Sequence, residues 1–100
     1  VGYCSSKGAL IAGSKAMALE LAAKKIRVNC VSPGHINGTM MSDDVFSTLP
    51  QESKKTIVDS HPLGLGEPSD VANSCVFLLS KAAKWITGTN LIVDGGYNAQ

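Results

Sequence analysis

Two apolar segments separated by a long crossover constrain the fold of this chain more than any other feature. Ile26 to Ser32 alternates apolar and polar residues and is stopped by Pro33-Gly34, which is typical of a β-strand. Asn90 to Val93 carries a continuous apolar run, as in strands covered on both faces. Parallel strands need a crossover that usually contains a helix, and such crossovers are right-handed. The sequence therefore predicts a right-handed parallel unit in an α/β fold.

Helical patterns precede the first strand and fill part of the crossover. The stretch from Tyr3 to Ala23 is rich in alanine, the residue with the highest helix propensity, and predicts a long helix. Pro68 suits a first helical turn, so another helix is predicted from there to about Ser80. The apolar residues predicted to be buried along these two helices include Leu10, Met17, Leu21, Phe77, Leu78 and Leu79.

Composition and charge narrow the functional class. Of 100 residues, 44% are hydrophobic and 17% charged, which predicts one globular domain at most. The formal net charge of +1 and the lack of a long apolar window predict no nucleic-acid partner, no membrane partner and no membrane span. His35 and His61 complete no zinc pattern with the three cysteines, so no metal site is predicted. The odd number of cysteines favours a reducing compartment and predicts a cytoplasmic location.

Tyr3 and Lys7 stand at the start of the predicted first helix and carry the strongest chemical signal. Positions i and i+4 lie on one helical face, so the pair presents a phenol and an ammonium to the same point. A free tyrosine has a pKa of about 10, and a cation held nearby favours the phenolate. Such a phenol can give a proton to a carbonyl oxygen or take one from an alcohol. The spacing alone fits equally well an exposed helix pair with no catalytic role. The motifs around the pair are needed to choose between the two interpretations.

The motifs around this pair follow a familiar order. Tyr3-x-x-x-Lys7 is followed by Arg27-Val28-Asn29, which runs into Pro33-Gly34, and much later by the segment Gly88 to Gly96. In this order and at these separations, they resemble the C-terminal part of the short-chain dehydrogenase/reductase family. The first motif looks like the catalytic pair of that family. The others look like its sixth strand with the turn at the nicotinamide, and its last strand.

The resemblance implies a fold and an activity. The fold is the C-terminal portion of a Rossmann-like doubly wound parallel sheet. Residues 1–100 then form the C-terminal part of a single NAD(P)-binding domain whose N-terminal nucleotide-binding half is absent. The activity is NAD- or NADP-dependent hydride transfer between nicotinamide and a small-molecule carbonyl or secondary alcohol. Both a 3-oxoacyl reductase and a sugar or polyol dehydrogenase fit, and the full-length form is implied to be a homodimer or homotetramer.

The resemblance also implies site residues. Tyr3 corresponds to the general acid/base, and Lys7 to the cation that favours its phenolate and binds the nicotinamide ribose. Pro33, Gly34 and Ile36 would border the nicotinamide, with Ile36 offering its backbone amide.

The loop that follows departs from the family pattern. The family usually carries a threonine after the Pro-Gly turn to help hold the cofactor. Gly38 occupies that position here, and Thr39 follows, so a one-residue shift assigns Thr39 to cofactor binding. The segment 35–66 corresponds to a mobile lid over the substrate, with short helices predicted over Asp43 to Leu49 and Gln51 to Ser60.

A second hypothesis concerns what the chain lacks. No glycine-rich phosphate loop follows a first strand, and the catalytic serine of the family would precede Tyr3. The chain begins with Val1, directly before its most informative motif, which favours a fragment. The alternative is therefore a non-catalytic fragment or subunit that acts only through protein–protein contacts. We expect the 100-residue chain alone to be inactive in either case.

Overall fold

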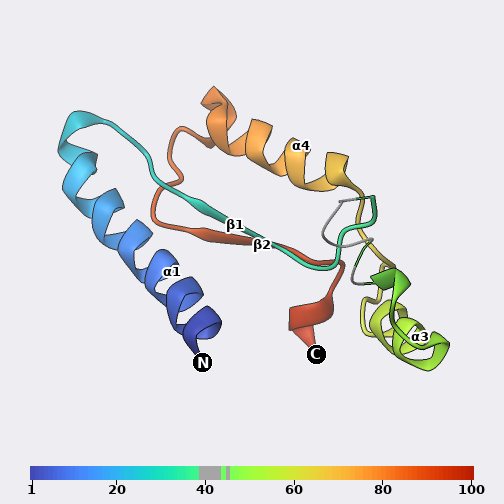
Figure 1. Cartoon of the computed structure of the whole chain (residues 1–100). Coiled ribbons are helices and arrows are strands. Elements are labelled where there is room, and N and C mark those ends of the chain that lie inside the picture. The colour runs from blue at the N-terminus through green and yellow to red at the C-terminus, as the bar shows by residue number, and fades with distance from the viewer. Residues whose placement is uncertain (39–43, 45) are drawn as a thin grey trace.

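Two parallel strands form the centre of the fold, and α1 and α4 lie on opposite sides of them (Figure 1). The computed structural model describes residues 1–38, 44 and 46–100. The elements are α1 (Gly2–Leu21), η1 (Ala22–Lys24), β1 (Cys30–Pro33), α3 (Gln51–Asp59), α4 (Pro68–Leu79), η2 (Lys81–Ala83), β2 (Asn90–Val93) and η3 (Tyr97–Ala99).

The predicted pairing of the two strands is confirmed. β1 and β2 pair in parallel, with Cys30 opposite Asn90 and Pro33 opposite Val93. α4 contacts both strands. On the other face, the Cys30 thiol donates to the Ser14 hydroxyl of α1 at 3.1 Å. A helix therefore lies on each face of the sheet, as expected for parallel strands, and both strands stay partly exposed.

The predicted start of the first strand at Ile26 is wrong, because β1 begins only at Cys30. Lys25 ends η1 in the left-handed conformation with φ of 60°, and the Ile26 N–H still donates to Leu21 O at 3.2 Å. Beyond it, the Val28 N–H donates to the Thr87 hydroxyl at 3.0 Å, so a side chain takes the place of a ladder partner. Residues 26–29 therefore form a hydrogen-bonded connection that leads into β1 but is not part of it.

The helices of the crossover agree with the sequence where they are described. α3 and α4 match the predicted segments to within a residue. Pro68 occupies the first turn of α4, and the Asp70 carboxylate accepts the Glu67 N–H at 2.8 Å, which closes the start of the helix. The predicted helix Asp43 to Leu49 lies partly outside the described residues, of which Asp44, Phe46 and Ser47 are helical.

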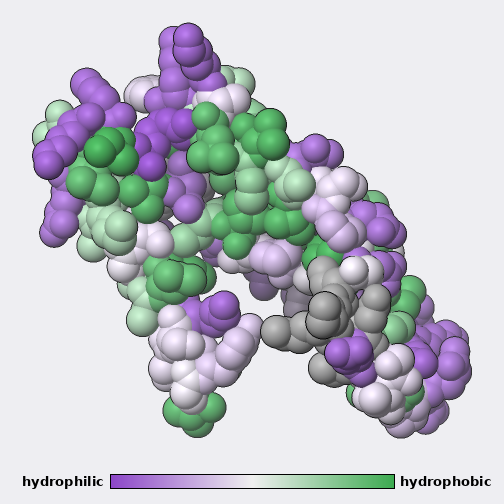
Figure 2. Space-filling view, turned by 45° about the horizontal axis from the view of Figure 1, so that its top comes forward, coloured by the Kyte–Doolittle hydropathy of each residue, from purple (hydrophilic) through white to green (hydrophobic). Residues whose placement is uncertain are grey.

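The predicted burial of the apolar stripes is wrong for most of their members. Leu10 is 59% exposed, Met17 50%, Phe77 43% and Leu79 83%, whereas Leu78 is buried as predicted. Figure 2 shows apolar patches on the surface of the molecule, including the region of α1 and α4. α1 and α4 therefore each carry apolar side chains that no other part of the described chain buries.

The overall dimensions agree with this open packing. The accessible surface is 7297 Å², whereas a compact chain of 10.4 kDa exposes about 5,400 Å². The radius of gyration is 15.8 Å, against about 13 Å for a compact domain of this length. Within the described ranges, no helix combines the length and hydropathy that crossing a bilayer requires.

Candidate functional site

Tyr3 and Lys7 lie in the first two turns of α1, as the sequence predicted. The Lys7 ammonium nitrogen is 5.5 Å from the centroid of the Tyr3 ring, so the two side chains share one face of the helix. Tyr3 is 74% exposed, and Lys7 is exposed as well. The phenol and the ammonium are therefore both open to a ligand. Their chemical roles stay predictions.

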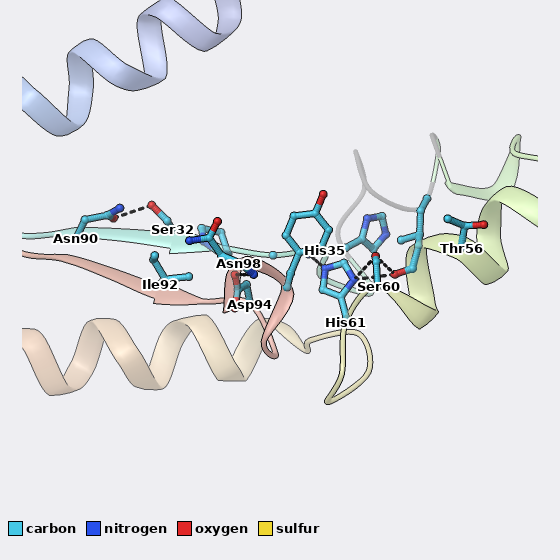
Figure 3. A pocket seen from close by; sticks show the side chains of 13 residues that line it. Ser32, His35, Thr56, Ser60, His61, Asn90, Ile92, Asp94 and Asn98 are labelled. Atoms are coloured by element: carbon cyan, nitrogen blue, oxygen red, sulfur yellow. Dashed lines mark hydrogen bonds between the residues drawn. The ribbon is translucent and has the colours of Figure 1, made fainter. Parts of the chain in front are cut away.

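Pro33, Gly34 and Ile36 come together at the carboxyl end of β1, where two hollows meet. The first hollow, of 760 Å³, is lined by Pro33, Gly34 and residues of α3 and the C-terminal segment. The second, of 400 Å³, is lined by Gly34, Ile36 and the segment 63–66. Figure 3 shows the side chains that line the first hollow. Ligands of open α/β sheets bind beyond the carboxyl ends of the strands, and the hollows lie there.

The turn after β1 is fixed by backbone hydrogen bonds. The Gly34 N–H donates to Val93 O at 3.0 Å, which extends the pairing with β2. Ile36 then forms a parallel bridge with Gly66, made by the Gly66 N–H to His35 O at 3.0 Å and the Asn37 N–H to Gly66 O at 2.8 Å. This bridge uses the amides before and after Ile36. The Ile36 N–H is not consumed by it, which fits the predicted use of this amide.

Gly34 has a packing reason to be glycine. A Cβ at this position would lie 2.9 Å from both Cα and Cβ of Asp94 and 3.1 Å from His61 Nε2. The nearest of these atoms belong to the backbone and the base of a side chain, so they cannot rotate away. A Cβ at Gly66, in contrast, would meet only the tip of the Ile36 side chain at 2.7 Å, with nothing else nearer than 3.8 Å.

We expect Gly34→Ala to destabilise the protein by roughly 1–3 kcal/mol, because overpacking forces the backbone to shift. Gly66→Ala is the matched control, and it should cost less, since the Ile36 side chain can change rotamer. Urea unfolding of the full-length variants measures both free energies. Equal costs for the two substitutions would contradict the close approach of Gly34 to Asp94.

His61 is a residue of this site that the sequence patterns assigned no role. It is 7% exposed, and it lies just after α3, against the turn that follows β1. Its Nδ1 lies 2.7 Å from Ile57 O, and its Nε2 accepts the His35 N–H at 3.2 Å. Its burial depends on segments far apart in the sequence, so local periodicity carried no signal for it.

The C-terminal segment closes the other side of the first hollow. The Asp94 carboxylate accepts the N–H groups of Gly96 at 3.1 Å and Asn98 at 2.8 Å, which folds the chain into η3. The Tyr97 ring then lies 5.0 Å from the His61 ring, centroid to centroid. The segment therefore packs against the end of α3.

The two groups of predicted residues do not meet. Figure 1 shows the first turns of α1 at the bottom of the view and the carboxyl ends of β1 and β2 near its middle, toward the right. Neither Tyr3 nor Lys7 is among the residues that line the two hollows. Thr39 lies outside the described residues. Within the described part of the chain, no group of three or more His, Cys, Asp or Glu side chains is placed to hold a metal.

Comparison with proteins of known sequence gives the chain a family. A family model described as enoyl-(acyl carrier protein) reductase matches residues 1–98. The NADP-dependent (R)-specific alcohol dehydrogenase of Lentilactobacillus kefiri is 44% identical over 101 residues, covering 98% of this chain and 38% of the relative. The 3-oxoacyl-[acyl-carrier-protein] reductase of Rickettsia bellii is 42% identical over 95 residues, covering 94% of this chain and 37% of the relative.

Solved structures agree with the sequence matches. A short chain dehydrogenase family protein from Francisella tularensis superposes with a TM-score of 0.88 at 35% identity, covering 98% of this chain and 43% of that one. A 4-hydroxyisoleucine dehydrogenase mutant complexed with NADH and succinate gives a TM-score of 0.85 at 36% identity, with coverages of 98% and 40%. The predicted α/β class, a portion of a Rossmann-like parallel sheet, is confirmed. The chain spans less than half of each of these proteins, and it belongs to the short-chain dehydrogenase/reductase family.

Proposed function

We propose that this chain is the C-terminal part of an NAD(P)-dependent oxidoreductase that transfers hydride between nicotinamide and a carbonyl or secondary alcohol. The observation that carries the proposal is the exposed Tyr3–Lys7 pair, with 5.5 Å between ammonium and ring, in a chain of this family. A relative named as NADP-dependent and a similar structure complexed with NADH support a nicotinamide cofactor. The names do not distinguish NAD from NADP.

Each residue of the pair has a proposed role. Tyr3 gives a proton to the carbonyl oxygen during reduction and takes one from the alcohol during oxidation. Lys7 favours the phenolate through its charge and binds the nicotinamide ribose. The exposure of both side chains supports these roles, because a substrate and a ribose can approach them.

The turn after β1, which is separate from the Tyr3–Lys7 pair, also supports a nicotinamide cofactor. When bound, the cofactor supplies the hydride, and the protein supplies position and proton transfer. Pro33 and Gly34 would border the nicotinamide, and Ile36 would donate its N–H, which the bridge to Gly66 does not use. The residues present therefore fit one wall of a nicotinamide site. Thr39 is proposed to complete it.

The substrate would lie under α3. Thr56, Ile57 and Ser60 of α3 and its C-cap line the first hollow, opposite Ile92 of β2 (Figure 3). We propose that α3 belongs to a lid over the substrate. The relatives include a 3-oxoacyl reductase and an alcohol dehydrogenase, so both an acyl thioester and a small ketone remain candidate substrates.

The assembly and location are also proposals. The exposed side chains of Phe77 and Leu79 on α4, together with Trp85 at 97% exposure, support a homodimer or homotetramer of the full-length protein. The three cysteines are all free, which supports a reducing, cytoplasmic compartment.

A cofactor titration of the full-length polypeptide tests the function. We expect saturable binding of NADH or NADPH, followed by oxidation of the bound cofactor when a 3-oxoacyl thioester or a ketone is added. Calorimetry measures the binding, and nicotinamide absorbance measures the turnover. A full-length protein that folds but binds neither cofactor would contradict the proposal and favour the non-catalytic alternative.

A further inference from the structure

His61 connects three parts of the fold at the base of the first hollow. Its ring nitrogens contact Ile57 O in α3 and the His35 N–H in the turn after β1. Its ring lies against Tyr97 of the C-terminal segment, with an interplanar angle of 30°. Gly34 leaves room for this ring, since a Cβ there would crowd His61 Nε2 at 3.1 Å. His61 is therefore a buried imidazole whose two ring nitrogens each have a polar partner.

The two polar contacts require one tautomer of the neutral ring. A carbonyl oxygen can only accept, so the 2.7 Å contact to Ile57 O puts the hydrogen on Nδ1. A backbone N–H can only donate, so the 3.2 Å contact from His35 requires a lone pair on Nε2. The Ser60 hydroxyl donates to Ile57 O at 2.7 Å, which leaves its oxygen able to accept from Nδ1–H at 3.3 Å. All these contacts agree with neutral His61 protonated at Nδ1.

We propose that His61, as this neutral tautomer, is a positioning residue that holds the Pro33–Ile36 turn in the conformation that binds nicotinamide. The claim that this turn binds nicotinamide rests on the proposed function; the claim that His61 positions the turn does not. His61 reaches the turn through the His35 N–H, one residue before the amide of Ile36. Losing that bond frees the turn from α3, and cofactor affinity then falls with the fraction of molecules that keep the binding conformation.

Protonation of His61 opposes the same bond. An imidazolium carries a hydrogen on Nε2, which would face the His35 N–H donor to donor. A ring with hydrogens on both nitrogens therefore cannot make the contact to the turn that the neutral tautomer makes. The other titratable groups around this hollow are the His35 and Tyr97 side chains and the Asp94 carboxylate. Asp94 is engaged with the N–H groups of Gly96 and Asn98, and α3 and its C-cap contribute only uncharged side chains to the lining.

Two substitutions in the full-length protein separate the acceptor from the shape of the ring. His61→Leu fills the space but offers no acceptor, and we expect cofactor Kd to rise about tenfold at pH 8, with KM for the cofactor rising more than kcat falls. His61→Gln places an amide oxygen near the position of Nε2. It should restore the affinity. His35→Gln keeps the backbone N–H that His61 accepts, and it should raise cofactor Kd less than His61→Leu does.

A measurement that needs no cofactor tests the positioning itself. The ¹⁵N shifts of labelled histidine, assigned with His61→Gln, should show His61 protonated at Nδ1, and the His35 amide should exchange faster in His61→Leu. If the wild type shows both but binds no nicotinamide, the proposed function fails and the positioning stands. If cofactor binds equally to wild type and His61→Leu at every pH, the positioning is overturned and the function stands. An Nε2-protonated His61, or a His35→Gln variant that loses as much affinity as His61→Leu, also overturns it.

Discussion

Replacing Tyr3 by phenylalanine in the full-length protein is expected to lower kcat by roughly 10²–10⁴-fold, the usual contribution of a general acid–base group. The substitution removes one oxygen atom and keeps the ring that lies 5.5 Å from the Lys7 ammonium. Because Tyr3 is 74% exposed and α1 does not depend on its hydroxyl, the fold should not change. The loss should therefore appear in turnover and hardly in cofactor Kd.

Steady-state kinetics with a calorimetric cofactor titration measures this effect. Lys7→Ala should also lower turnover, and in addition it should weaken cofactor binding, because Lys7 is proposed to bind the ribose. Lys15→Ala removes another exposed lysine two turns further along α1 and serves as the matched control. Tyr3→Phe that keeps more than about a tenth of kcat would remove Tyr3 from proton transfer.

Residues 1–100 expressed alone are expected to bind neither NADH nor NADPH and to be molten or aggregated in dilute buffer. The chain exposes 7297 Å², about a third more than a compact protein of its mass. Its sheet has two strands of four residues, so each strand leaves one edge unpaired. The formal net charge of +1 gives little repulsion between molecules to oppose association.

Sedimentation, binding of a hydrophobic dye and cofactor titration measure this behaviour. The full-length protein is the control, and it should sediment as a defined species with little dye bound. A monodisperse, cooperatively unfolding 100-residue chain that binds a nicotinamide cofactor would show that the rest of the domain is not needed.

The elements of the fold were largely predictable, because their signals are local. The alanine-rich pattern specified α1, Pro68 marked the start of α4, and the apolar run specified β2. The first strand was predicted to begin four residues too early, because apolar alternation at Ile26 and Val28 satisfied the strand pattern. There the Val28 N–H donates to the hydroxyl of Thr87, 59 positions away, instead of to a backbone carbonyl. Alternation alone cannot report such a bond.

Burial and the finer parts of the site were less predictable. Leu10 and Met17 have helical spacing, but spacing shows only which face is apolar, and not whether this stretch of chain covers it. The pairing of Tyr3 with Lys7 followed from i,i+4 geometry. His61 did not, because its role comes from Ile57, His35 and Tyr97 converging in space.

The parallel register between β1 and β2 also orders events during synthesis. Cys30 pairs with Asn90, 60 positions later, and the bonds of Asn29 to residues 86 and 89 span similar distances. At the usual 5–20 residues per second, β1 waits roughly 3–12 s at the ribosome before its partner strand is made. α1 needs only local contacts and forms in about a microsecond. The helix that carries Tyr3 and Lys7 can therefore form well before the β1–β2 pair on which it packs.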